Sequence, residues 1–246
     1  TRWVDQGTPR GDPGDEPERI KFTEGWKIGE PDATFVASTQ VLPAELEDEY
    51  RYVLVPTGFK EDRWISAAEI RPGNYNVVHH VIVFQADAAS GKEDLTGSLG
   101  GYAPGSPPLI MDKGFGMKIP AGAILVLQIH YHKEPGKVER DQTTIGLKFA
   151  KSTVKKQVLF GTVGTEKFVI PPRTADYPVD ATFTVKEDIH LEQLVPHMHL
   201  RGKDMKVWAK FPDGTTKDLL VVPNYDFKWQ TFYELAEPLA LPKGTE

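Results

Sequence analysis

The sequence predicts an all-β protein made of antiparallel sandwiches or barrels. Short runs rich in β-branched and aromatic residues recur along the chain and are separated by turn signals, as in strands joined by hairpins. The 246 residues include 22 Gly and 20 Pro, a density that suits short strands and turns better than helix bundles. Helical signals are few, and residues 43–49 offer at most one helical turn. We therefore expect packed sheets rather than a helical core.

The strand series begins after a polar arm. Residues 1–32 should form an arm or linker, because TPRGDPGDEP is rich in Pro, Gly and acidic residues and has no apolar periodicity. Regular structure should begin near Phe35. Each later apolar run that is bounded by turn residues predicts a strand. The predicted strands are residues 50–55, 77–84, 124–131, 144–149, 155–164, 168–170, 181–185, 191–198, 205–211 and 219–222.

Length and one break in composition predict two domains. A chain of this size accommodates one large or two small domains. The polar segment KSTVKK at 151–156 interrupts the strand series, so we expect domains at 33–152 and 153–246. In the second domain, Pro212-Asp213-Gly214 predicts a hairpin turn between two strands.

Composition excludes several classes of function. A net charge of −6 argues against binding to nucleic acid or to an anionic membrane surface, both of which need clustered positive charge. No apolar run is long enough to predict a membrane-spanning helix, and the polar first residues predict no signal peptide within this chain. With no Cys, disulfides, thiolate metal sites and cysteine nucleophiles are excluded.

The histidines are unusually placed. Six of the seven form three tight pairs, which are His79-His80, His130-x-His132 and His197-x-His199. Each pair lies in or beside a predicted strand, where residues i and i+2 point to the same face. The members of each H-x-H pair can therefore share a face, and two imidazoles on one face are the basic unit of a nitrogen-donor metal site.

Adjacent His79 and His80 should point to opposite faces of a regular strand. Both can bind one ion only if a bulge or a strand end redirects one of them. The alternative for all three pairs is an incidental role at the surface or in hydrogen bonding, as in a β-sandwich that binds a carbohydrate or a protein partner.

The donor set narrows the choice of metal. Imidazole suits zinc, copper, iron and nickel. Glu134 and Asp204 are near the histidines in sequence, but the H-E-x-x-H pattern of many zinc hydrolases is absent. The H-x-D/E pattern expected of a two-histidine, one-carboxylate iron site is also absent. Histidine clusters with Met available favour copper, so the residues predict two or three histidine-rich sites that favour this metal.

At these residues the sequence resembles the copper type II, ascorbate-dependent monooxygenases, the family of dopamine β-monooxygenase and the peptidylglycine α-hydroxylating monooxygenase. The resemblance covers most of residues 33–246, and the bacterial members are the most similar. It rests on four segments in the same order, which are HHVIVF, YAPGSPP with IPAG, LQIHYH and PHMHLRGK.

The resemblance implies a fold and a set of ligands. It implies two antiparallel jelly-roll-like β-sandwich domains with a cleft between them and one copper in each. His79, His80 and His130 would bind the electron-transfer copper, and His197 and His199 the catalytic copper. The motif assigns the ligand role to His130, although strand geometry makes His132 an equal candidate. Gln128 and Tyr131 are expected to orient the ligands, and His190 matches no motif.

Two departures from the family pattern limit the analogy. The family's catalytic copper takes a Met as third ligand from a Glu-Met segment that would lie beyond Glu246, so we expect the second sandwich to be truncated here. Met198, between the two histidines, and Met205 are expected to pack in the core instead. Val195 stands where peptidylglycine enzymes have an Arg that holds the peptide carboxylate, so a peptide C-terminus is a poor substrate.

The resemblance implies hydroxylation of an activated C–H bond of a small molecule with O₂. It also implies an extracytoplasmic location, periplasmic or secreted. The electrons would come from ascorbate or from a cytochrome c, since Trp3-Val4-Asp5-Gln6-Gly7 resembles the end of a cytochrome c domain fused to some bacterial relatives. The alternative is a non-catalytic copper-binding or electron-transfer module of a larger protein.

Overall fold

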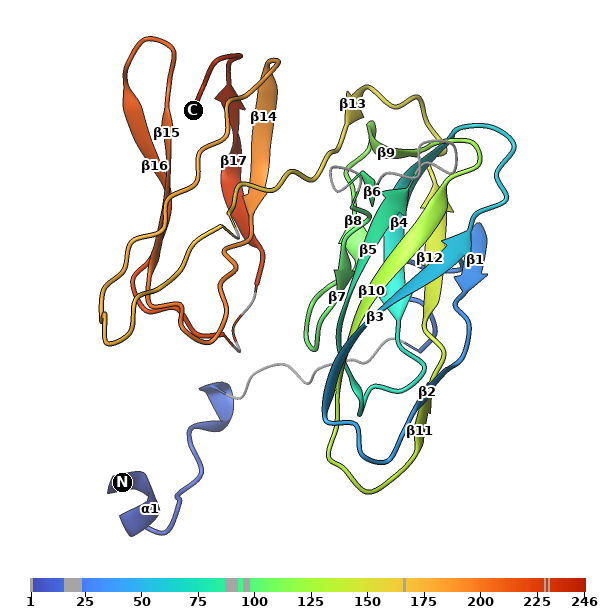
Figure 1. Cartoon of the computed structure of the whole chain (residues 1–246), viewed down its shortest axis with the longest axis vertical. Coiled ribbons are helices and arrows are strands. Elements are labelled where there is room, and N and C mark those ends of the chain that lie inside the picture. Colours follow the sequence, from blue (N-terminus) through green and yellow to red (C-terminus); the bar gives the residue numbers. More distant parts are fainter. Residues whose placement is uncertain are drawn as a thin grey trace. The chain divides into compact units, whose positions relative to one another are not determined.

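A computed structural model describes residues 2–15, 24–86, 93–94, 98–165, 167–227, 229 and 231–246 (Figure 1). The predicted all-β class is confirmed, since 41% of the chain is strand and 3% is helix. The chain divides into two compact units, Thr1–Leu159 and Phe160–Glu246, named unit 1 and unit 2 here. No helix in the described ranges has the length and apolar character needed to cross a membrane.

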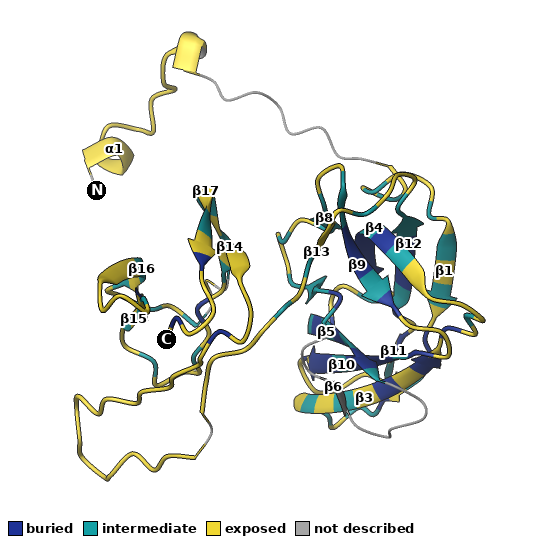
Figure 2. Cartoon of the chain, turned by 90° about the horizontal axis from the view of Figure 1, so that it is seen from above, coloured by how far each residue is buried: buried dark blue, intermediate teal, exposed yellow. Residues whose placement is uncertain are grey.

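Unit 1 is a sandwich of two sheets, and in Figure 2 buried residues, in dark blue, lie along strands of both layers. Most pairings within the sheets are antiparallel. The described strands of the first sheet run in the order β1-β12-β4-β9-β13, with β8 paired to β4, and those of the second in the order β3-β10-β5-β6, with β7 paired to β5. A separate two-stranded sheet joins β2 and β11.

The strands of the first sheet are β1 (Ala33–Val36), β12 (Thr144–Phe149), β4 (Arg63–Arg71), β9 (Phe115–Ile119), β13 (Lys156–Gln157) and β8 (Leu109–Ile110). Those of the second sheet are β3 (Asp48–Pro56), β10 (Ile124–His132), β5 (Val78–Ala86), β6 (Glu93–Asp94) and β7 (Gly101–Tyr102), and the small sheet joins β2 (Gln40–Leu42) to β11 (Glu139–Asp141). Because β13 pairs with β9, unit 1 extends past the expected boundary at 152/153.

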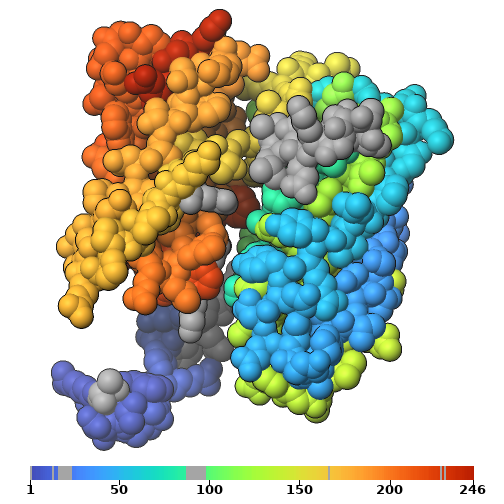
Figure 3. Space-filling model, viewed as in Figure 1, coloured from blue at the N-terminus to red at the C-terminus, as the bar shows by residue number. Residues whose placement is uncertain are grey.

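Alternation along β10 decides which side chains enter the core of unit 1. Leu125, Leu127, Ile129 and Tyr131 are fully buried and point toward the other sheet. The residues between them, including His130, therefore occupy the opposite, outward face of the sheet formed by β3, β10 and β5. In Figure 3, side chains from the blue part of the chain that contains β3 lie at the surface of unit 1.

The last part of the predicted arm packs on unit 1. The guanidinium of Arg71 lies over the ring of Trp26 at 4.9 Å, and the Asp32 amide donates to the Leu147 carbonyl at 2.8 Å. The arm also contains α1 (Arg2–Asp5) and a 3₁₀ turn at Pro13–Asp15. Residues 16–23, also predicted to belong to the arm, are outside the described ranges.

Unit 2 contains two antiparallel strand pairs among its described residues. β14 (Ile189–Leu194) pairs with β17 (Tyr233–Leu241), and β15 (Met205–Lys210) pairs with β16 (Thr216–Val222). The predicted turn at 212–214 joins β15 to β16, where the Thr215 amide donates to Asp213 Oδ1 at 2.9 Å. Three buried residues, Val185, Ala209 and Leu241, form a small core.

Several strand predictions at the end of unit 1 and in the first part of unit 2 are wrong. Residues 168–170 and 181–185 are not strands, and of 155–164 only β13 is one. Apolar residues such as Phe168 and Phe183 are exposed there. A strand needs a partner for its amides and carbonyls, and in this segment only a few residues pair, as Val185 does with Gly244 and Thr245. The predicted helical turn at 43–49 is likewise a turn that leads into β3.

Candidate metal centre

Three adjacent strands of unit 1 gather histidines on the outward face of one sheet. The register places His130 on β10 directly opposite Tyr50 on β3 and opposite His80 on β5. His132 stands opposite Asp48 in the same ladder. Directly opposite side chains on one face lie close enough to interact, so this register alone brings His80 and His130 together.

A β-bulge adds His79 to the same group. His130 pairs with His80, whereas the next residue, Tyr131, pairs with Val78, so the register skips His79. A bulge sets two residues of one strand against one residue of its partner and redirects a side chain. The bulge required by the sequence argument is therefore present, and both adjacent histidines can approach His130.

The three imidazoles are close enough to hold one metal ion. One ligand atom from each of His79, His80 and His130 lies within 4.8 Å of the others. The Nδ1 atoms of His79 and His80 are 3.1 Å apart. With metal–nitrogen bonds of about 2.0–2.1 Å, two nitrogens on one ion stand roughly 3.0–3.4 Å apart, so this pair already has the required separation.

The buried ring of His130 points to the same conclusion. Its side chain is 8% exposed, and its Nδ1 atom is buried without a hydrogen-bond partner. Its Nε2 atom contacts both carboxylate oxygens of Asp48, at 3.0 and 3.1 Å. Buried polar atoms are nearly always paired, so a ring nitrogen left without a partner beside two other imidazoles fits a metal ligand.

Electrostatics keep His79 in the neutral form that binds metals. Burial lowers the pKa of His79, and repulsion from His130 and His132 lowers it further. Burial alone would raise the pKa of Asp48. Its hydrogen bonds and charge interactions with His130 and then His132 outweigh that effect and hold the pKa below its ordinary value. The site thus combines one imidazole, His79, whose protonation is disfavoured, with a carboxylate whose ionised form is favoured.

His132 lies beside the cluster rather than within it. Its side chain is 64% exposed, and its Nδ1 atom is 3.4 Å from Asp48 Oδ2. Its ring centroid is 6.4 Å from that of His79. The structure therefore separates two histidines that strand geometry treats as equivalent.

The residues expected to orient the ligands make other contacts. Gln128 donates to the hydroxyl of Tyr52 at 2.6 Å, and the hydroxyl of Tyr131 donates to Asp141 at 2.9 Å. Two residues that the sequence did not single out contact His130 instead. Asp48 accepts from its ring, and Tyr50 stacks on it with centroids 4.2 Å apart and an interplanar angle of 3°. Only the pairing register of β3 with β10 could have indicated them.

A buried carboxylate supports the turn that leads into the bulge. Asp141 Oδ1 accepts from the amides of Gly73 and Asn74 at 2.8 and 3.0 Å. Its Oδ2 accepts from the hydroxyls of Tyr131 and Thr143, both at 2.9 Å. This network links β10 to the chain just before His79 and so helps to place both sides of the cluster.

Unit 2 holds the second predicted pair in a loop. β14 ends at Leu194 and Pro196 follows, so His197, which was predicted to lie in this strand, and His199, predicted beside it, both lie beyond its end. Their ring centroids are nevertheless 5.1 Å apart, and both residues are exposed. In the described part of unit 2, no third histidine or carboxylate completes a three-ligand group with them.

Tyr225 fixes the residue between these histidines. Its hydroxyl donates to the Met198 carbonyl at 2.6 Å and accepts from the Met198 amide at 3.0 Å. A Cβ on Gly202 would lie 2.6 Å from the Met198 Cβ and 2.9 Å from the Tyr225 ring. Met198 therefore packs against Gly202 and Tyr225, but it is only half-buried and lies outside the small core of unit 2. His190 is exposed on β14.

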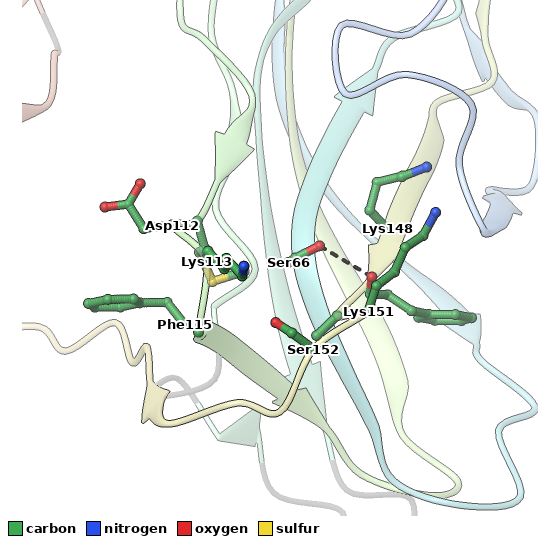
Figure 4. A pocket seen from close by; sticks show the side chains of 11 residues that line it. Ser66, Asp112, Lys113, Phe115, Lys148, Lys151 and Ser152 are labelled. Carbon is green, nitrogen blue, oxygen red and sulfur yellow. Dashed lines mark hydrogen bonds between the residues drawn. The ribbon is translucent and has the colours of Figure 1, made fainter.

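A separate cavity of unit 1 contains none of the histidines. It has a volume of about 570 Å³ and lies where β12 and the segment before β9 face each other. Figure 4 shows Lys148 and Lys151 on one side of it and Asp112 on the other, with Ser66 bonded to the Phe149 carbonyl. The Lys148 ammonium donates to the Glu30 carbonyl at 2.7 Å. Because no candidate ligand lines this cavity, it does not form part of the candidate metal centre.

Comparison with known proteins leaves the family open. No protein-family model matches the chain, and no curated protein matches it either.

Proposed function

We propose that unit 1 binds one copper ion through His79, His80 and His130, and that the chain is a copper-dependent monooxygenase. The observation that carries the proposal is the buried Nδ1 of His130, which has no hydrogen-bond partner and stands beside two further imidazoles. The nitrogen-only donor set suits copper, and the absence of Cys leaves the metal to histidine.

Each residue of the cluster has a defined task. The bulge presents His79 and His80 from one strand, and β10 supplies His130 from the next. Burial lowers the pKa of His79, which favours the neutral imidazole that a metal requires. Copper bound here would supply one-electron chemistry, since imidazole holds the metal in both of its common oxidation states.

The proposed reaction is hydroxylation of an activated C–H bond of a small molecule with O₂, with ascorbate or a cytochrome c as electron donor. Reaction would take place at unit 2, where His197 and His199 supply two imidazoles from a loop that Tyr225 anchors. The resemblance of LQIHYH and PHMHLRGK to the copper monooxygenases supports this division of roles. It also supports an extracytoplasmic location.

A non-catalytic copper or electron-transfer module is the second candidate. The observation that favours it is the pair in unit 2, which among described residues has two imidazoles and no third nitrogen or carboxylate ligand. In that case unit 1 would bind copper and exchange electrons, but no hydroxylation would follow.

Copper loading of matched variants tests the first step. Wild type, His130→Ala and the control His190→Ala should be loaded with Cu(II), dialysed and analysed for metal. We expect His130→Ala to lose the copper of unit 1 and His190→Ala to retain it, since His190 is exposed on β14 of unit 2. Copper at trace level in wild type would exclude both candidates and favour a β-sandwich that binds a carbohydrate or protein partner.

Oxygen consumption separates the two candidates. The copper-loaded chain should be assayed with ascorbate and a panel of small amines and aryl compounds, with His197→Ala as the comparison. Substrate-dependent oxygen uptake that His197→Ala abolishes supports the monooxygenase. Tight copper binding with no turnover in the full-length protein supports the module.

A further inference from the structure

The carboxylate of Asp48 contacts one of the two ring nitrogens of His130, Nε2. It is the first residue of β3 and stands opposite His132 in the β3–β10 ladder. Its two carboxylate oxygens are 3.0 and 3.1 Å from His130 Nε2. Asp48 therefore occupies Nε2, and the buried Nδ1, which has no hydrogen-bond partner, is the nitrogen left for a ligand role.

This contact selects one tautomer of His130. A neutral imidazole carries a single N–H, and an ionised carboxylate can only accept a hydrogen bond. The proton is therefore favoured on Nε2, toward Asp48, which leaves the lone pair on Nδ1. The other tautomer would bury an N–H at Nδ1, where the structure offers no acceptor, and would set a lone pair against the carboxylate.

Tyr50 restrains the ring in the remaining direction. Its ring is nearly parallel to that of His130, with centroids 4.2 Å apart. Asp48 holds the imidazole at its edge, whereas Tyr50 covers one face. Together they limit rotation of the ring, whose centroid is 4.9 Å from those of both His79 and His80.

We infer that Asp48 is the positioning residue of the candidate metal centre, since it holds His130 as the Nε2–H tautomer and directs Nδ1 to the metal. This inference rests on the proposed function in that it assigns the ion to His79, His80 and His130. Ligand histidines commonly donate their second nitrogen to a carboxylate, which fixes the tautomer and raises the basicity of the ligand.

The competing role for Asp48 is a surface ion pair with His132. The Asp48 side chain is 57% exposed, and exposed ion pairs contribute little to stability. A purely structural Asp48 would therefore leave the His130 tautomer and the copper affinity unchanged when replaced. His132→Ala removes that pair while leaving the contact of Asp48 with His130 in place.

The tautomer is measured first, without any metal. Nitrogen-15 NMR of the metal-free full chain reports which ring nitrogen of His130 carries the proton. We expect the Nε2–H form in wild type, in His132→Ala and in the exposed control Glu45→Gln, and a mixture of tautomers in Asp48→Ala. An Nδ1–H form in wild type, or an unchanged Nε2–H form in Asp48→Ala, would overturn the inference.

Copper affinity is measured second, by competition with a chelator of known affinity. Loss of a carboxylate that supports a ligand histidine weakens metal binding by about 10–100-fold. We expect a loss of this size in Asp48→Ala, a smaller one in Asp48→Asn, whose amide oxygen can still accept from Nε2, and none in Glu45→Gln. Equal affinity in Asp48→Ala and wild type would overturn the inference.

The two measurements fail independently. If wild type binds no copper, the proposed function fails, and the tautomer experiment still decides whether Asp48 orients His130. If wild type binds copper and Asp48→Ala binds it equally well, the copper site of the proposed function is supported. The inferred role of Asp48 is then refuted. The isosteric Asp48→Asn keeps the comparison available should the alanine variant fold poorly.

Discussion

Replacing Asp141 perturbs the support of the candidate metal centre without touching a ligand. The carboxylate is 2% exposed and joins Tyr131 and Thr143, both fully buried, to the turn that contains Gly73 and Asn74. Two substitutions separate the loss of the Asp141 charge from the loss of its hydrogen-bond acceptors. Asp141→Asn preserves shape and one acceptor, whereas Asp141→Ala removes every acceptor.

The burial of the partners sets the magnitude. The Gly73 amide lies at an exposed residue, where water can replace the lost acceptor, but the hydroxyls of Tyr131 and Thr143 cannot reach water. Each buried hydroxyl left unpaired costs about 1–3 kcal/mol, so Asp141→Ala should destabilise unit 1 by roughly 2–6 kcal/mol. In Asp141→Asn the amide oxygen can face the backbone and its NH₂ can donate to the hydroxyls. Each hydroxyl oxygen then keeps one hydrogen bond while its own O–H loses its acceptor, so the loss should be smaller than in Asp141→Ala, at about 1–3 kcal/mol.

Hydrogen exchange at the β10 amides measures this cost in unit 1 alone. The opening free energy of these buried amides reports the stability of the sandwich, whereas a single melting curve would mix the two units. Asp218→Asn, at an exposed ion pair of unit 2, is the control and should leave β10 unchanged. A loss below about 1 kcal/mol in Asp141→Ala, or equal losses in the two Asp141 variants, would refute the reasoning that unpaired buried hydroxyls set the cost.

Three further predictions concern other parts of the chain. Gly101→Ala should destabilise unit 1 by about 1–3 kcal/mol, because its Cβ would collide with a carbonyl of β5, whereas Gly161→Ala, with open space around it, should leave the unfolding transition unchanged. The pKa of His79 in the metal-free protein should lie below 6.5 by proton NMR. Unit 1 should therefore lose stability as the pH falls below 6.5, because the unfolded chain binds that proton more readily than the folded chain. A titration midpoint at or above 6.5 would contradict this. Tyr225→Phe should speed exchange of the Met198 amide several-fold, because two hydrogen bonds worth about 0.5–1.5 kcal/mol each are lost; unchanged exchange would show that the loop does not depend on Tyr225.

Local pattern accounts for the parts of the fold that were predicted correctly. The runs around Val53, Val83 and Leu127 have the composition and length of strands, and they are β3, β5 and β10. The turn at Gly214 follows from residues that favour it whatever surrounds them. By contrast, β4 was missed, because RWISAAEIR is buried along most of its length and lacks a clean alternation.

The strands that were wrongly predicted show the limit of the same reasoning. Phe168 and Phe183 lie in runs with the composition of strands, but strand formation needs a partner that composition cannot supply. The spacing of Val78 and Val81, both buried, could have indicated the bulge, since an odd separation places two residues on one face only if one residue is extra.

The sequence by itself determined the all-β class, the three histidine pairs and the exclusion of cysteine chemistry, because these depend on residue type and short-range spacing. Tertiary structure decided that His79, His80 and His130 meet, that His132 stands aside, and that Asp48 and Tyr50 hold the ring of His130. The physical reason is register. Which residue faces which across β3, β10 and β5 depends on the pairing of strands that are distant in sequence and on the register shift at the bulge in β5.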